Sequence, residues 1–121
     1  MTTTTHQTLD QQRAAFAWKC VKDGCSKEYV ALASGASALV SSNGLLQALA
    51  YYYQKKGEAR KLGSHIQSWL SERNKVPADF KGFVERILDP QFGSSEYLRL
   101  TEEALEFLKW LRQFAKANEK G

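Results

Sequence analysis

The chain has 121 residues, of which 43% are hydrophobic and 25% are charged, and its formal net charge is +4. This length suits a single domain that buries roughly two thirds of its unfolded surface, and its eight glycines and two prolines are too few for a many-turned β sandwich. No apolar run in the sequence is long enough for a secretory signal or a membrane-spanning helix, so we expect a cytoplasmic protein.

Three helices are expected in the first half of the chain, over residues 8–23, 26–41 and 45–56. Gly24 follows the first of them in the usual C-terminal place, and Ser26 is a suitable cap for the second. Asn43 and Gly44 form a turn signal between the second and the third. Gly57 is expected to end the third helix.

The second half of the chain also reads as helical. A fourth helix is expected over residues 58–73, and Pro77 is favourable as the first residue of a fifth, which is closed by Pro90. After a short turn at residues 96–100, Thr101 is expected to cap the final helix, because a hydroxyl at this position can accept an orphan backbone N–H.

The sequence therefore predicts an all-α fold, a single compact domain of about six helices in an irregular or orthogonal bundle. We expect the domain to span residues 8–118, with a disordered lead-in at residues 1–7 and a frayed end at residues 119–121. Apolar side chains cover more of the last helix than a single buried face needs, which favours assembly. Trp18 and Trp110 are candidates for interface anchors or for core positions.

Three successive tyrosines, Tyr51, Tyr52 and Tyr53, fall in the third helix. Since each residue of a helix turns by about 100°, the three rings cannot all point inward. One or two rings are expected to pack in the core, and at least one is expected at the surface near the cations of residues 55–61. An exposed ring beside cations can stack a nucleic-acid base or border a protein interface.

The positive charge is concentrated in the first half of the chain and is densest at residues 55–61. A modest basic excess of this kind permits contacts with phosphates, without the long runs that coat duplex DNA. Several cations recur three or four residues apart, a spacing that places both members of a pair on one side of a helix. The candidate phosphate-binding residues are Lys19, Lys22, Lys55, Lys56, Arg60, Arg112 and Lys116.

No group of residues in the sequence predicts catalysis or a bound metal. Glu102, Glu103 and Glu106 fall in the first turns of the last helix, and we interpret them as a solvated face that the helix dipole favours. His65 has no nucleophile or carboxylate near it in sequence and is expected at the solvent edge of its helix. The two cysteines lack the further ligands of a zinc site and are expected to be reduced and partly buried. We therefore expect no enzyme, no metal site and no cofactor.

Two motifs resemble the small subunit of the Cmr complex, which is the type III-B CRISPR effector. Residues 43–51 (NGLLQALAY) are similar to the NGL-x-x-x-LAF segment of that family, with Tyr51 in place of phenylalanine. Residues 100–115 (LTEEALEFLKWLRQFA) are similar to the C-terminal helix of the family. The order of the motifs, the chain length and the helical pattern agree as well, so the resemblance spans most of the chain.

The resemblance implies a non-catalytic subunit of an antiviral ribonucleoprotein, with no small-molecule substrate and no membrane contact. Copies of such a subunit stack head to tail into an inner filament, which runs beside the backbone subunits and meets the large polymerase-like subunit. They line the channel in which target RNA pairs with the guide RNA, and their basic side chains contact its phosphates. Because the matching motifs are packing motifs, the choice of the seven cations as RNA contacts rests on charge placement alone.

Two other interpretations stay open. The chain could be a helical module that bridges proteins without RNA, in which case its cations only promote solubility. It could also be the small subunit of a type III-A complex, which is likewise small, helical and basic. A DNA-binding regulator is disfavoured, because its best candidate for a recognition helix, residues 58–73, carries the apolar residues Ile66 and Trp69 in a core stripe.

Overall fold

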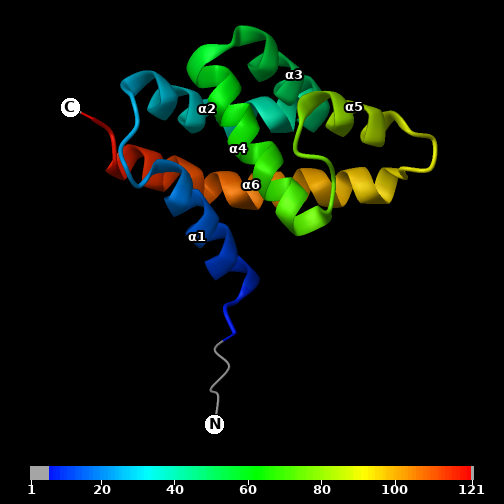
Figure 1. Cartoon of the computed structure of the whole chain (residues 1–121), viewed down its shortest axis with the longest axis horizontal. Coiled ribbons are helices and arrows are strands. Elements are labelled where there is room, and N and C mark those ends of the chain that lie inside the picture. Colours follow the sequence, from blue (N-terminus) through cyan, green and yellow to red (C-terminus); the bar gives the residue numbers. More distant parts are fainter. Residues whose placement is uncertain (1–5, 121) are drawn as a thin grey trace.

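The computed structural model describes residues 6–120 and contains six helices within that range (Figure 1). These helices are α1 (Leu9–Val21), α2 (Lys27–Asn43), α3 (Leu45–Lys55), α4 (Gly57–Asn74), α5 (Phe80–Leu88) and α6 (Ser94–Ala117). No strand occurs among the described residues, where a single isolated bridge joins Cys25 to Glu119. The predicted all-α fold of about six helices is confirmed.

The longest helix, α6, is the centre of the fold (Figure 1). α1, α2 and α4 pack against α6, and α3 packs against both α2 and α4. In Figure 1, α1 and α4 run at an angle to α6. The buried side of α6 includes Leu100, Phe107, Leu108 and Leu111, a spacing typical of a helix with one face in the core. Where α4 contacts α6, Trp69 of α4 stacks on Phe107 with the ring centroids 5.8 Å apart.

Several helix boundaries follow directly from capping residues that the sequence displays. The Thr8 hydroxyl accepts the backbone N–H of Gln11, and the Gln11 side chain accepts the N–H of Thr8 in return, which closes a capping box at α1. Ser26 caps α2 by accepting the N–H of Tyr29. Gly44 separates α2 from α3 at a φ of 90°, a conformation that glycine adopts readily.

Two predicted boundaries near the middle of the chain are wrong. Gly57 begins α4 instead of ending α3, because the chain breaks one residue earlier, at Lys56. Pro77 does not begin α5, which starts at Phe80. The cap is Asp79, whose carboxylate accepts a backbone N–H in the first turn at 2.8 Å, and an aspartate cap satisfies an orphan donor that proline cannot.

The predicted start of the last helix is also wrong. α6 begins at Ser94 and continues without a break, so Thr101 is an internal residue whose hydroxyl donates to the Tyr97 carbonyl at 3.0 Å. The added turns are held by a tertiary contact, since the Tyr97 hydroxyl accepts the backbone N–H of Leu46 at 3.0 Å. That bond satisfies one of the free N–H groups at the start of α3.

The prediction that Glu103 belongs to a solvated face is wrong. This residue is buried, with 8% of its surface exposed. Arg13 donates to its two carboxylate oxygens at 2.6 and 2.9 Å, and the indole N–H of Trp69 donates at 2.9 Å. Glu102 is exposed, and Glu106 pairs with a neighbouring lysine. Because a buried carboxylate requires partners, Glu103 ties α1 and α4 to α6.

The ends of the chain are described unequally. Residues 1–5 of the predicted lead-in and residue 121 lie outside the described residues. Within the segment expected to fray, Lys120 donates its backbone N–H to the Cys25 carbonyl at 2.9 Å, and the Cys25 N–H donates to the Asn118 carbonyl at 3.0 Å. These bonds join the C-terminus to the turn between α1 and α2, while the predicted domain limits stay a prediction.

Candidate nucleic-acid interface

The seven candidate cations are available at the surface. Six of them are exposed, and Arg60 is half-buried. The ion pairs formed within residues 6–120 involve only Arg13 and Lys109 as cations. Within that range, therefore, no carboxylate neutralises any of the seven, and surface cations without such a partner can bind phosphate.

Lys61 of α4, a cation outside the predicted set, acts on the same thiol as Lys19 of α1. Both act on Cys20, where burial raises the pKa of the thiol to about 11 and the two positive charges oppose that rise. Their ammonium groups lie 5.5 Å from the ring centroid of Phe16 and 5.8 Å from that of Tyr29, respectively. The density of charge at residues 55–61 is the signal that could have identified Lys61.

The turn between α3 and α4 gathers Lys55, Lys56 and Arg60. The Lys55 ammonium lies 5.3 Å from the centroid of the Tyr51 ring, and the Arg60 guanidinium lies 3.9 Å from that of Tyr53. Arg60 also donates from Nε to the Tyr53 carbonyl at 2.8 Å. Arg60 is therefore held in place by packing and a hydrogen bond, whereas the two lysines extend from the surface.

The three successive tyrosines divide as predicted. Tyr52 is buried, at 2% exposure, whereas Tyr51 and Tyr53 are 42% and 41% exposed. The Tyr53 ring stacks on Phe80 of α5, with centroids 4.2 Å apart and planes 10° from parallel. Because Phe80 and the Arg60 guanidinium cover Tyr53, Tyr51 beside Lys55 is the exposed ring on which a nucleic-acid base can stack.

Arg112 and Lys116 form a separate pair, one turn apart on the exposed side of α6. The C-terminal half of α6 and the turn between α3 and α4 lie apart in the fold (Figure 1). Lys22 caps the C-terminal end of α1, one turn after Trp18, which is 44% exposed and packs edge-on against Phe114 of α6. The structure thus brings the candidates together in small groups and distributes these groups over several helices.

Lys56 has a strained backbone, which leads to a prediction about stability. Its φ of 61° and ψ of −171° lie in a region that costs a non-glycine residue about 1–3 kcal/mol. Glycine relieves that strain but adds roughly 0.5–1 kcal/mol of unfolded-chain entropy. We expect Lys56→Gly to raise the free energy of unfolding by about 1 kcal/mol, as measured by urea denaturation.

Lys55→Gly is the matched control for Lys56→Gly, because it removes the same charge from the last residue of α3. In a helical conformation, glycine is expected to lower the free energy of unfolding by about 0.5–1 kcal/mol. If the two variants were destabilised equally, the backbone at Lys56 would not be strained.

The remaining candidates for chemistry are arranged for packing. His65 is half-buried, further inside than its predicted place at the solvent edge, and its Nδ1 lies 2.7 Å from the Tyr29 hydroxyl. Cys20 is half-buried and Cys25 is buried, and both are free thiols. In the described part of the chain, no cluster of three or more His, Cys, Asp or Glu side chains could hold a metal ion. Nor does any helix there have the length and apolar character needed to cross a membrane.

Comparison with known proteins places these features in a family. The family model described as CRISPR-associated protein (Cas_Cmr5) matches residues 9–118. The fold is similar to the crystal structure of a CRISPR-associated Cmr5 family protein from Thermus thermophilus, with a TM-score of 0.76 and 28% sequence identity. That alignment covers 94% of this chain and 100% of the other. The family match contains all seven candidate cations.

Proposed function

The chain belongs to the Cas_Cmr5 family and is a small subunit of a Cmr-type CRISPR effector, and we propose that it is a non-catalytic, RNA-contacting part of that complex. Its copies stack into an inner filament beside the backbone subunits and the large polymerase-like subunit. Its basic side chains contact the backbone of target RNA paired with the guide RNA. We propose residues 8–118 as the folded unit that does so.

The observation that carries this proposal is the set of exposed cations without carboxylate partners. Within residues 6–120, Lys19, Lys22, Lys55, Lys56, Arg60, Arg112 and Lys116 form no ion pair. Within the same range, ion pairs involve only three acids, Asp10, Glu103 and Glu106, so the seven cations keep their charge available for phosphates. Unpaired cations on several helices suit a flexible, extended polyanion.

Stacking is supported by exposed apolar residues at two different places. Trp18 is exposed beside the C-terminal half of α6, where it packs on Phe114. Leu88 and Leu98 are 66% and 58% exposed where α5 ends and α6 begins. Leu98 and Phe114 are about 24 Å apart along the helix axis. Two unlike patches at opposite ends favour a head-to-tail contact, since a two-fold dimer would use one patch twice.

The test is a charge reversal in the assembled complex. Lys19→Glu combined with Lys56→Glu is expected to weaken retention of target RNA by roughly tenfold, because two phosphate contacts and their released counterions are lost. Binding is measured with labelled target RNA across a salt series. The salt dependence should become shallower by about 0.7 in log–log slope for each contact removed.

Lys75→Glu combined with Lys81→Glu is the matched control, since both lysines are exposed and neither is a candidate contact. This control changes the net charge equally and should leave RNA retention near that of the unaltered complex. Equal retention in both double variants would remove Lys19 and Lys56 from the RNA contacts. Association of the subunit with its complex that does not weaken as salt rises would favour an RNA-independent bridging module.

A further inference from the structure

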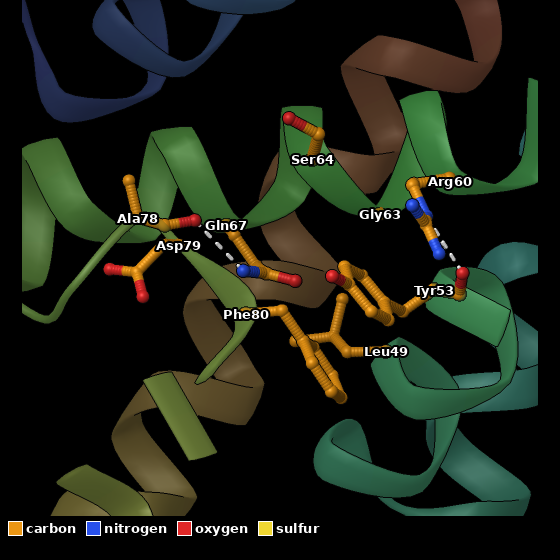
Figure 2. A pocket seen from close by; sticks show the side chains of 9 residues that line it. All are labelled: Leu49, Tyr53, Arg60, Gly63, Ser64, Gln67, Ala78, Asp79 and Phe80. Atoms are coloured by element: carbon orange, nitrogen blue, oxygen red, sulfur yellow. Dashed lines mark hydrogen bonds between the residues drawn. The ribbon is translucent and has the colours of Figure 1, made fainter. Parts of the chain in front are cut away.

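A cavity of about 280 Å³ lies between α3, α4 and the segment that leads into α5 (Figure 2). Leu49 and Tyr53 line it from α3, Arg60, Ser64 and Gln67 from α4, and Phe80 from the start of α5. The lining is largely apolar with a few polar groups, which is the usual character of a small-molecule site. Its volume is at the lower limit for such sites, so it suits one ring system and a short attachment.

Gln67 supplies an unpartnered polar atom to this cavity. The residue is only 3% exposed, and its Nε2 donates to the Ala78 carbonyl at 2.9 Å, which fixes the orientation of the amide. No residue within 6–120 donates a hydrogen bond to its Oε1, and this oxygen is not completely buried by the protein. The Oε1 therefore opens to the cavity, where a donor from a ligand would satisfy it.

A stack of three planar groups forms one wall of the cavity. The Arg60 guanidinium covers one face of the Tyr53 ring at 3.9 Å, and Phe80 stacks on the other face at 4.2 Å, so neither face of Tyr53 is free for a ligand. The Nε–H of Arg60 donates a hydrogen bond to the Tyr53 carbonyl. Its Nη groups have no acceptor among the described residues, so they can bind an anion at the rim.

The opposite rim carries the other sign of charge. Figure 2 shows Asp79 and Arg60 on opposite sides of the cavity, with Gln67 between them. The Asp79 carboxylate already accepts the Gly82 N–H as the cap of α5. A matching ligand therefore has an apolar body, donates hydrogen bonds near Gln67 and carries negative charge near Arg60.

We propose that this cavity binds one unpaired ribonucleotide, with its base inside and its phosphate on the Arg60 guanidinium. This inference rests on the proposed RNA-contacting function and adds a base-binding site to it. A base has the N–H donor that the Gln67 Oε1 lacks and an apolar body that fits the largely apolar lining, and its phosphate supplies the anion. Unstacked bases splayed out of an RNA strand are commonly held by hydrogen bonds to their edges and by contacts with aromatic side chains.

The first test uses the full chain with 5′-AMP as the probe and ribose 5-phosphate as the probe without a base. Amide chemical shifts measured by NMR should move in a saturable way at Ser64, Gln67 and Phe80 with 5′-AMP. Ribose 5-phosphate is expected to bind at least roughly tenfold more weakly, because it lacks the apolar contact area and the N–H donor of a base. Absence of saturable shifts at these residues up to millimolar 5′-AMP would overturn the proposal.

Two variants probe the cavity without changing its charge. Gln67→Met removes the acceptor at nearly constant volume and is expected to weaken 5′-AMP binding by roughly tenfold. Ser64→Trp fills the cavity from an exposed position and should abolish the shifts at Gln67. Ser41→Trp places the same bulk at an exposed position of α2, outside the cavity, and should bind 5′-AMP as the unaltered chain does. Unchanged binding in Ser64→Trp would also overturn the proposal.

The outcome is separable from that of the charge-reversal test. Retention of RNA that depends on Lys19 and Lys56, together with no binding of 5′-AMP in the cavity, would reject the base site and keep the backbone contacts. Binding of 5′-AMP at Gln67, together with retention insensitive to those lysines, would keep the site and reject the proposed backbone contacts.

Discussion

Replacement of Glu103 by alanine is expected to lower the free energy of unfolding by about 3–5 kcal/mol, which is the range for breaking a buried ion pair from one side. The carboxylate accepts two bonds from Arg13 and one from the indole of Trp69. The side chains of Arg13 and Glu103 are 14% and 9% exposed. Without Glu103, the Arg13 charge keeps only Asp10, an exposed partner, and the buried indole N–H loses its acceptor.

Urea denaturation at neutral pH measures this loss, and Glu102→Ala is its control. Glu102 precedes Glu103 on the same helix and is exposed, so its removal should change the free energy of unfolding by no more than about 0.5 kcal/mol. A double variant, Arg13→Met with Glu103→Leu, should recover much of the loss, since it leaves no charge unpaired. Similar stabilities of Glu103→Ala and Glu102→Ala would contradict the structural role of the pair.

The fold could largely be predicted because its helix boundaries are mostly local. Caps such as Ser26 and breaks such as Gly44 act within one turn of the chain, so they are visible in the sequence. The start of α6 is not local. It depends on Tyr97, whose hydroxyl bonds to Leu46 across the fold, and Thr101 offers a plausible cap that the folded chain does not use.

The chemistry of single residues was harder to predict where their partners are distant. Glu103 follows the pattern of a dipole-favoured face, but its partners are 34 and 90 residues away in the sequence. Gln67 is flanked by Ile66 on the buried side of α4, so its burial could have been inferred from the helical stripe. The unpartnered Oε1 of Gln67 could not have been inferred from the sequence. The amide is oriented by the segment around Ala78, which packs against Gln67 only in the folded chain.

For the surface cations, the sequence predicts exposure better than it predicts their arrangement in space. Charge density and helical spacing identified residues that prove to be exposed, since long charged side chains seldom lose their water. Their arrangement depends on how the helices pack, which spacing alone does not determine. Lys19 and Lys61 act on the same thiol, that of Cys20, because α1 contacts α4, while Arg112 and Lys116 follow α6 to another part of the surface.

His65 makes the stability of the fold dependent on pH in a defined window. Its Nδ1 lies 2.7 Å from the hydroxyl of the fully buried Tyr29. Burial raises the pKa of that hydroxyl well above its ordinary value, so Tyr29 stays protonated beside the imidazole. Burial, and secondarily the charge of Lys61, lowers the pKa of His65 to about 4, with Glu58 acting in the opposite direction.

The sign of the pH effect follows from this lowered pKa. Between pH 6.5, the ordinary value, and about 4, the unfolded chain binds a proton at His65 that the folded chain does not. The free energy of unfolding is therefore expected to fall as the pH is lowered through this window, by about 3 kcal/mol in total. Asp10, whose pKa is lowered chiefly by the hydrogen bond from Trp110, changes stability only at lower pH.

Urea denaturation at a series of pH values from 7 to 4 tests the effect with two histidine variants. His65→Gln keeps a neutral hydrogen-bonding side chain beside the Tyr29 hydroxyl but cannot bind the proton, so the slope of stability against pH should flatten within the window. His6→Gln removes the other histidine of the chain, which is exposed, and should leave the slope unchanged. If the slope survived in His65→Gln, groups other than this buried imidazole would control the acid sensitivity of the fold.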